Sequence, residues 1–402
     1  MKVSDDMTTY MNVLKPKLKG DTVCKHTLIF RRRWAEVLKD ALSAWLFLLA
    51  GVGLNGADGN SQDAFQLTIA QANTENPRNS ESDIIALNEG RLLLGWSEFY
   101  GKTSADDGSA RIVGRVSEDG GRSWGKKYTL VEHEDGRNVM EVNFIRLKSG
   151  EIALFHFKKY EEVADTWNKS TSKTGDCRMI MRVSKDEGRS FGPPRELTQK
   201  NRYVESASGR GLMLKSGRIV IECDDYFGSA FCLISDDDGK TWHEGKRIKP
   251  VGGGCWEPAA IELKDGRLLM FLRTILGGQY QTISQDGGET WSVPTLTALR
   301  GSGSPIAIER IPRTGDLLAI WNHDVGSPHS RNPLTAAIST DDGQTWKHIQ
   351  NIEDKSDDRW AYPAVTWVEN RALITYFNYK GGMSLQLKSL PIDWFYQVRP
   401  RQ

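Results

Sequence analysis

Short apolar segments alternate with turn residues along most of the chain. Six of these segments follow a turn that contains Gly or Asn, and each has the length of a single β-strand. They cover residues 91–99, 151–157, 218–223, 267–273, 316–321 and 371–378. This spacing predicts a series of β-hairpins rather than helices.

An eight-residue phrase recurs between these hairpins, with the pattern Ser-x-Asp-x-Gly-x-Ser/Thr-Trp/Phe. Its Asp can accept hydrogen bonds from backbone N–H groups a few residues later, and its Gly suits a backbone with positive φ. A repeat at roughly 50–70 residues indicates a propeller or another array of repeated units. The copies occupy residues 117–124, 184–191, 235–242, 284–291 and 339–346.

Six hairpins and five phrases predict an all-β fold, a six-bladed β-propeller of four-stranded antiparallel blades, in which the sixth blade lacks the phrase. Residues 64–71 alternate between apolar and polar and are expected to add the outer strand of the sixth blade. This strand would close the ring and leave no free sheet edge. We expect one propeller domain over residues 58–402, with blades at about 75–131, 139–198, 203–250, 255–297, 302–350 and 360–388 plus 64–71.

The first 57 residues do not fit the repeat. A basic run at residues 31–33 and Lys39 precede an apolar stretch at residues 41–54. This stretch is too short to span a bilayer but suits a signal peptide. Residues 1–57 are therefore interpreted as a basic leader and signal peptide of a secreted or periplasmic protein with no stable membrane insertion after processing. A membrane anchor or an unrelated helix is the alternative.

Composition narrows the classes of partner. The formal net charge is +1, so nucleic acid is not an expected partner. The Cys and His spacing gives no zinc pattern, and we expect no metal, no cofactor and a monomer. Cys223 and Cys232 flank a short loop, where they could form a disulfide or remain two buried thiols.

Strand direction assigns a role to each face of the propeller. Because blades are antiparallel, the Gly turns and the repeated phrases must share one face, while the loops between second and third strands and the links into new blades share the other. Function is expected at the second face. Its candidate residues include three arginines, acidic residues and a tyrosine, a set that favours an anionic ligand: Arg78, Asp106, Asp107, Glu257, Arg273, Arg331 and Tyr362.

The phrase resembles the Asp-box of the sialidase (neuraminidase) superfamily, and the resemblance covers about residues 75–380. Arg78 is similar to the arginine that opens blade one in that family. Glu257 and Arg273 are similar to the Glu and Arg of blade four, and Tyr362 to the tyrosine that opens blade six. Two departures indicate a divergent member: Arg-Asn-Ser at residues 78–80 replaces Arg-Ile-Pro, and residues 97–100 lack a further arginine.

This resemblance implies an exo-sialidase with a retaining mechanism. In that reading, Arg78, Arg273 and Arg331 bind the carboxylate of sialic acid through charge-assisted hydrogen bonds. A neutral phenol avoids the repulsion that a carboxylate nucleophile would meet, so Tyr362 is the implied nucleophile and Glu257 the group that takes its proton, with nearby arginines favouring the phenolate.

The resemblance also implies roles for three acidic residues of blade one. Asp107 matches the catalytic acid and base better than Asp106 does, which leaves Asp106 as a substrate-binding residue. Glu98 is similar to an acidic residue that orients the arginine cluster. Two other functions stay open: a hydrolase or lyase for another acidic sugar such as a uronic acid, and a glycan-binding propeller without turnover.

Overall fold

The computed structural model describes residues 64–160, 175–327 and 329–397. The predicted leader and signal peptide, residues 1–57, lie outside the described residues. Within the described ranges, no helix has both the length and the apolar character needed to cross a membrane.

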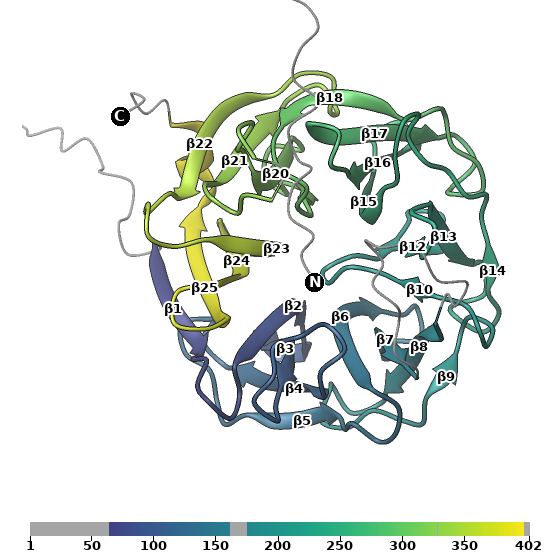
Figure 1. Ribbon diagram of the computed structural model, residues 1–402, viewed down its shortest axis with the longest axis vertical. Helices are drawn as coiled ribbons and strands as arrows, with labels where there is room; N and C mark the ends of the chain where they lie inside the picture. The colour runs from purple at the N-terminus through teal and green to yellow at the C-terminus, as the bar shows by residue number, and fades with distance from the viewer. Residues whose placement is uncertain (1–63, 161–174, 328, 398–402) are drawn as a thin grey trace, which may run out of the picture. The chain divides into compact units, whose positions relative to one another are not determined.

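The described chain forms six antiparallel blades around a central axis (Figure 1), as the repeats predict. In the first three blades the strands are β2 (Arg78–Ala86), β3 (Leu92–Phe99), β4 (Ala110–Ser117) and β5 (Tyr128–Val131); β6 (Asn138–Arg146), β7 (Ile152–Lys159), β8 (Cys177–Ser184) and β9 (Arg195–Glu196); and β10 (Val204–Glu205), β12 (Ile219–Asp225), β13 (Ala230–Ser235) and β14 (His243–Glu244), with the short β11 (Leu212–Met213) beside β12.

The last three blades follow the same order from the inner to the outer strand. Their strands are β15 (Trp256–Glu262), β16 (Leu268–Arg273), β17 (Gly278–Ser284) and β18 (Thr295–Arg300); β19 (Ala307–Arg310), β20 (Leu317–Asn322), β21 (Leu334–Ser339) and β22 (Lys347–Glu353); and β23 (Trp360–Val368), β24 (Arg371–Asn378), β25 (Ser384–Pro391) and β1 (Phe65–Ala70). Two 3-10 helices, η2 (Asn88–Gly90) and η3 (Ile392–Tyr396), complete the described elements.

The first strand closes the ring, which confirms the prediction for residues 64–71. β1 pairs antiparallel with β25, with Phe65 opposite Ser389 and Leu67 opposite Leu387. The sixth blade is therefore assembled from both ends of the propeller sequence, and its outer strand is paired as in the other blades.

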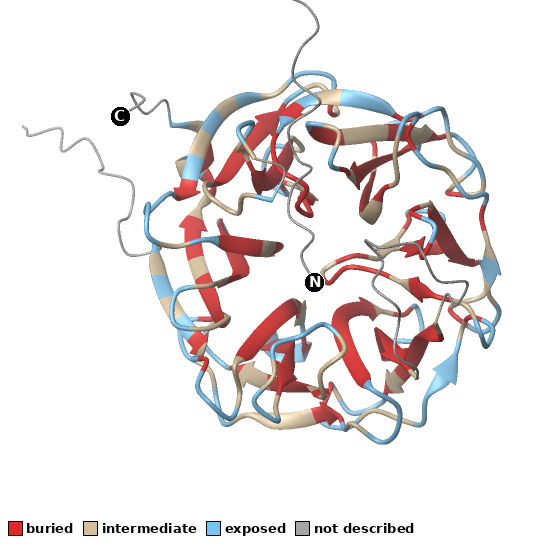
Figure 2. Ribbon diagram, in the orientation of Figure 1, coloured by how far each residue is buried: buried red, intermediate tan, exposed pale blue. Residues whose placement is uncertain are grey.

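The core consists of six hydrophobic clusters, each filling the space between two neighbouring blades. Leu93 and Leu154, for example, pack in the cluster shared by blades one and two. Inner and middle strands are mainly buried, whereas outer strands such as β18 and β22 carry exposed positions (Figure 2).

The repeated phrases are structural, as predicted. In the third copy, Asp237 Oδ1 accepts hydrogen bonds from the Thr241 backbone N–H at 2.7 Å and from Ser235 Oγ at 2.9 Å. This turn presents Trp242 edge-on to Phe155 of the preceding blade, with ring centroids 5.5 Å apart. The phrase therefore contributes to packing between neighbouring blades. It lies on the face opposite the candidate residues.

The two cysteines of blade three do not form a disulfide. Cys223 is opposite Phe231 in the strand pairing and Cys232 is opposite Glu222. This register sends the two side chains to opposite faces of the blade, where each joins a different core cluster. Both are free buried thiols, so the disulfide alternative is wrong.

Candidate active site

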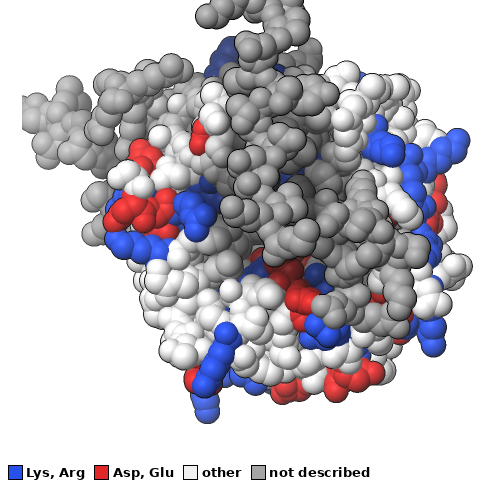
Figure 3. Space-filling model, in the orientation of Figure 1, with Lys and Arg blue, Asp and Glu red and all other residues white. Residues whose placement is uncertain are grey.

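A pocket of about 690 Å³ opens at the centre of the face that carries the blade links and the loops between second and third strands. Seven of the eight residues singled out from the sequence line it: Arg78, Asp106, Asp107, Glu257, Arg273, Arg331 and Tyr362. On the visible part of this face, acidic and basic side chains are intermixed around the rim (Figure 3).

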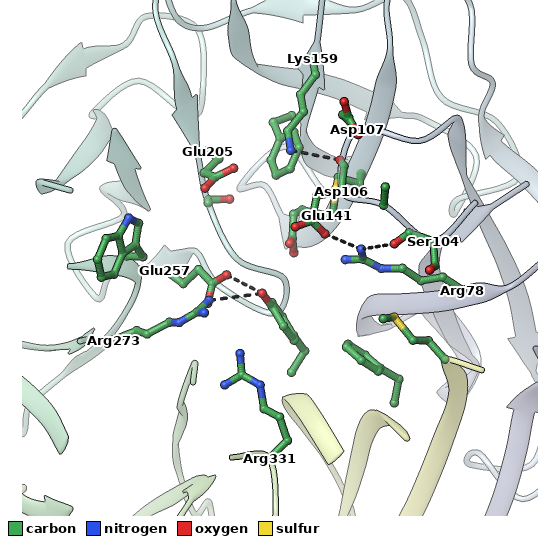
Figure 4. Close-up of a pocket in the computed structure, with 18 of the residues that line it drawn as sticks. Arg78, Ser104, Asp106, Asp107, Glu141, Lys159, Glu205, Glu257, Arg273 and Arg331 are labelled. Carbon is green, nitrogen blue, oxygen red and sulfur yellow. Dashed lines mark hydrogen bonds and ion pairs between the residues drawn. The ribbon is translucent and has the colours of Figure 1, made fainter. Parts of the chain in front are cut away.

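Tyr362, Glu257 and Arg273 form a connected group inside the pocket (Figure 4). The Tyr362 hydroxyl donates a hydrogen bond to Glu257 Oε1 at 2.6 Å. Arg273 Nη1 binds Glu257 Oε2 at 2.5 Å and lies 3.4 Å from the Tyr362 oxygen. The phenol, the group that can take its proton and a cation that can stabilise the phenolate are thus in contact.

Burial keeps the Tyr362 phenol protonated. Its pKa is raised well above the ordinary value by burial and then by the charge of Glu257, while Arg273 and Arg331 act in the opposite direction. The arginines were expected to favour the phenolate, but burial outweighs them. Tyr362 is therefore a hydrogen-bond donor at rest, and Glu257 must take its proton during any reaction.

Glu257 is held by its backbone as well as by its side chain. It has a positive φ of 44° and lies in an irregularity of the pairing between β15 and β16. Its N–H donates to Asp224 Oδ1 at 2.8 Å, and Asp224 belongs to β12 of the preceding blade. Asp224 is fully buried and its Oδ2 has no hydrogen-bond partner among the described residues.

The same backbone device recurs in other blades. Positive φ values occur at Glu81 (44°), Glu141 (69°) and Tyr362 (57°), all in inner strands at interruptions of the strand pairing. A non-glycine residue is disfavoured in this region by about 1–2 kcal/mol. Four inner strands therefore bend at corresponding places. Each bend directs a glutamate or, in the sixth blade, the tyrosine toward the axis of the propeller.

Arg78 is oriented by a residue that the sequence analysis missed. Its Nη2 binds Glu81 at 2.6 Å, its Nε donates to Ser80 Oγ at 2.7 Å, and its guanidinium lies 4.3 Å from the centre of the Phe99 ring. Arg78 Nη1 binds Asp106 at 2.5 Å. Ser80, which stands in place of the proline of the usual Arg-Ile-Pro, is thus one partner of this arginine, and Glu81 next to it is another.

The other two arginines converge on one carbonyl group. Arg273 Nε and Arg331 Nη1 both donate to the backbone oxygen of Gly303, each at 2.9 Å. Arg331 comes from the loop between β20 and β21, and Arg273 ends β16. Two guanidinium groups held this way present further N–H donors to one side of the pocket (Figure 4).

The two aspartates of the loop between β3 and β4 occupy different positions. Asp106 faces Arg78, whose charge is the largest cause of its lowered pKa. Asp107 accepts a hydrogen bond from Arg137 at 3.1 Å. This geometry favours Asp106 over Asp107 as the acid nearest the arginines.

Glu98 does not take part in the pocket, contrary to the expectation that it orients the arginine cluster. It is buried, and its Oε2 binds Arg111 at 2.9 and 2.7 Å while its Oε1 binds Lys127. Glu98 is directly opposite Arg111 in the pairing of β3 with β4, so the two side chains lie on the same face of the blade. Glu81 supplies the contact with Arg78 instead.

Three further charged residues line the pocket: Lys159, Glu141 and Glu205. None of the three is among the candidate residues named from the sequence. One signal could have found them, since the innermost strands of blades one to four each contain a glutamate near their start, at Glu81, Glu141, Glu205 and Glu257. Aligning the blades with one another would have revealed this recurrence.

Comparison with known sequences relates the chain to one family. The sequence model of the BNR repeat-like domain matches residues 90–375. Mouse Sialidase-3 is 30% identical over 180 residues, 37% of this chain and 42% of that protein. Rat Sialidase-3 is 29% identical over 179 residues, 38% of this chain and 43% of that protein. The match thus spans less than half the length of these curated relatives.

Solved structures share the fold at lower identity. The NanB sialidase of Streptococcus pneumoniae has a TM-score of 0.66 at 18% identity, covering 82% of this chain and 71% of its own. A Trypanosoma rangeli sialidase in complex with 2,3-difluorosialic acid, as a covalent intermediate, has a TM-score of 0.66 at 18% identity, covering 83% and 60%. A Dyadobacter fermentans protein of unknown function has a TM-score of 0.64 at 19% identity, covering 81% and 99%.

Proposed function

The chain belongs to the sialidase superfamily, and we propose that it is a glycoside hydrolase that removes a terminal acidic sugar of the sialic acid class from glycans. The observation that carries this proposal is the contact of Tyr362 with Glu257 at 2.6 Å, beside Arg273, inside a pocket with three arginines. A binding protein needs the arginines but gains nothing from a phenol hydrogen-bonded to a carboxylate.

The proposed reaction begins with the substrate carboxylate bound by Arg273 and Arg331, which share an anchor on Gly303. Tyr362 attacks the anomeric carbon as its proton passes to Glu257 Oε1. Arg273, which touches both groups, stabilises the negative charge that develops on the phenol oxygen. The product of this step is a sugar bonded covalently to Tyr362.

The leaving oxygen needs a proton, and we assign this role to Asp106 in place of Asp107. Arg78 holds the pKa of Asp106 below its ordinary value in the empty pocket. A substrate carboxylate that binds Arg78 would replace Asp106 as the partner of its guanidinium. The pKa of Asp106 would then rise, and Asp106 would hold a proton more readily. Asp106 would donate the proton to the leaving group and later activate the water that releases the sugar with retention.

The first experiment is hydrolysis of the 4-methylumbelliferyl α-glycoside of N-acetylneuraminic acid. We expect wild-type turnover and a loss of kcat of more than about 100-fold in Tyr362→Phe, because phenylalanine keeps the ring but cannot attack. Intact-mass measurement with 2,3-difluorosialic acid should show a covalent adduct on the wild type and none on Tyr362→Phe.

The aspartate assignment is tested with the same substrate. Asp106→Asn should lower kcat by more than about 100-fold, and Asp107→Asn should lower it by less than about tenfold. The reverse order would return the acid role to Asp107. Turnover that survives in Tyr362→Phe would rule out the nucleophile, and no turnover and no adduct with folded wild type would remove the sialidase-type assignment.

A further inference from the structure

The two sides of the pocket carry opposite charge (Figure 4). Arg273 and Arg331 lie on one side, whereas Glu205 and Glu141 lie across the cavity from them, and Asp106 is ion-paired with Arg78. Four basic and five acidic side chains line the pocket: Arg78, Lys159, Arg273 and Arg331, and Asp106, Asp107, Glu141, Glu205 and Glu257. A pocket built only for an anion has no need for this second, acidic side.

Two of these carboxylates, Glu141 and Glu205, have hydroxyl partners rather than ion pairs among the described residues. Glu141 Oε2 accepts a hydrogen bond from Ser208 Oγ at 2.5 Å, and Glu205 Oε2 accepts one from the Tyr203 hydroxyl at 2.5 Å. Neither carboxylate forms an ion pair within the described part of the chain. Lys159, which lines the same region, donates from Nζ to the backbone oxygen of Asp106 at 3.1 Å.

Glu141 is the more constrained of the two. It is only 4% exposed, and no ion pair with a Lys or Arg is formed by its carboxylate among the described residues. Burial, and next the charge of Glu81, raise its pKa well above the ordinary value. A buried, ionised carboxylate without a cationic partner is unfavourable by several kcal/mol, and a cation brought against it would offset much of that cost.

The backbone also commits Glu141 to the pocket. Its positive φ of 69° turns the side chain toward the axis, and its N–H donates to Ser97 Oγ at 3.0 Å. A non-glycine residue is disfavoured in this conformation, so the surrounding structure must hold the Glu141 backbone in place. A neutral apolar side chain at this position would have completed the wall without the cost of burying a carboxylate.

We propose that the pocket selects an acidic sugar that also carries a primary ammonium group, with the carboxylate on the arginine side and the ammonium between Glu141 and Glu205. This inference rests on the proposed function and narrows its substrate class to sialic acids whose C5 amine is free rather than acylated. In a six-membered sialic acid ring, C2 bears the carboxylate and C5 lies across the ring from it. Binding the carboxylate to the arginines therefore places the C5 substituent at the opposite, acidic side.

The experiment compares two substrates that differ only at C5: the 4-methylumbelliferyl α-glycosides of neuraminic acid, with a free amine, and of N-acetylneuraminic acid. Each is measured with wild type, Glu141→Gln, Glu205→Gln and the control Glu262→Gln. Glutamine keeps the shape and the acceptor oxygen but removes the charge. Glu262 ends β15 at the opposite face, where it accepts the Lys215 N–H at 3.0 Å.

We expect wild type and Glu262→Gln to favour the free amine by at least tenfold in kcat/KM. In Glu141→Gln or Glu205→Gln this ratio should fall toward one, mainly through a higher KM for the amine. Equal use of both substrates, or preference for the N-acetyl form, would overturn the inference and leave the proposed function standing. A preference that persists in both pocket variants would also overturn it. No turnover of either glycoside would remove both proposals.

Discussion

Asp224 provides a direct test of how the catalytic geometry is maintained. This residue is fully buried in β12, and its Oδ1 accepts the Glu257 N–H at 2.8 Å across the interface between blades three and four. Glu257 has a φ of 44°, and its carboxylate is the partner of Tyr362. We therefore regard Asp224 as a positioning residue that acts on the reaction through Glu257.

The size of its effect follows from the lost hydrogen bond. Asp224→Ala leaves the largely buried Glu257 N–H without an acceptor, which is unfavourable by about 1–3 kcal/mol. The local backbone can avoid that cost by returning Glu257 to negative φ, which also releases about 1–2 kcal/mol of left-handed strain. The carboxylate would then leave Tyr362, and kcat should fall by roughly 10- to 100-fold at about 1.4 kcal/mol per factor of ten.

Asp224→Asn is the matched variant. The Asp224 pKa is raised well above its ordinary value by burial and by Glu205, so the neutral amide is a close substitute for this side chain. Its carbonyl oxygen can still accept the Glu257 N–H, and kcat should stay within about threefold of wild type.

The assay is hydrolysis of a 4-methylumbelliferyl sialoside, with kcat and KM determined separately and folding checked by thermal unfolding. KM should change little, because Asp224 is not one of the described residues that line the pocket. Wild-type kcat in a folded Asp224→Ala would refute the reasoning. Equal losses in the alanine and asparagine variants would also refute it, since only one of them removes the acceptor.

Two further predictions concern stability. Glu98→Gln should lower the free energy of unfolding by about 2 kcal/mol, because the buried Glu98 carboxylate binds Arg111. The KM for the sialoside should stay unchanged, because Glu98 does not line the pocket. A raised KM would show that Glu98 does act in the site. Burial raises the pKa of Glu222 to about 7 and of Glu309 to about 8, from 4.5. The folded protein thus holds protons that the unfolded chain has lost, and its stability should fall as pH rises from about 5 to 8, by at most about 1.4 kcal/mol per pH unit per group. In urea titrations, Glu309→Gln should flatten this decline, and an unchanged slope would contradict the assignment.

The sequence predicted the ring and the functional face because those depend on repetition and on strand direction. The five phrases and six apolar segments define the blades, and antiparallel order places Arg78 and Arg331 on one face although they are far apart in sequence. The positions of Glu81 and Glu141 could not be predicted this way. Each lies at an interruption of strand pairing, where regular alternation no longer tells which side a residue faces.

The same limit explains the error at Glu98 and the uncertainty at Cys223. The resemblance assigned Glu98 to the arginine cluster, but in the observed register Glu98 lies opposite Arg111 and binds it. Cys223 and Cys232 flank a loop symmetrically, yet the observed register pairs Cys223 with Phe231. A shift of one residue in register reverses the side of every residue in a strand, and the sequence does not fix register to that precision.

The site depends on contacts between successive blades more than on any single blade. Ser97 in β3 accepts the Glu141 N–H of blade two, and Asp224 in β12 accepts the Glu257 N–H of blade four. At the junction of blades six and one, the Asn79 N–H donates to the Met383 backbone oxygen at 2.7 Å beside Arg78. The disfavoured backbone conformations of Glu141 and Glu257 are thus each supported by a neighbouring blade. Closing the ring with β1 stabilises the final blade, which contributes Tyr362, and ring closure is therefore a condition for assembling the site.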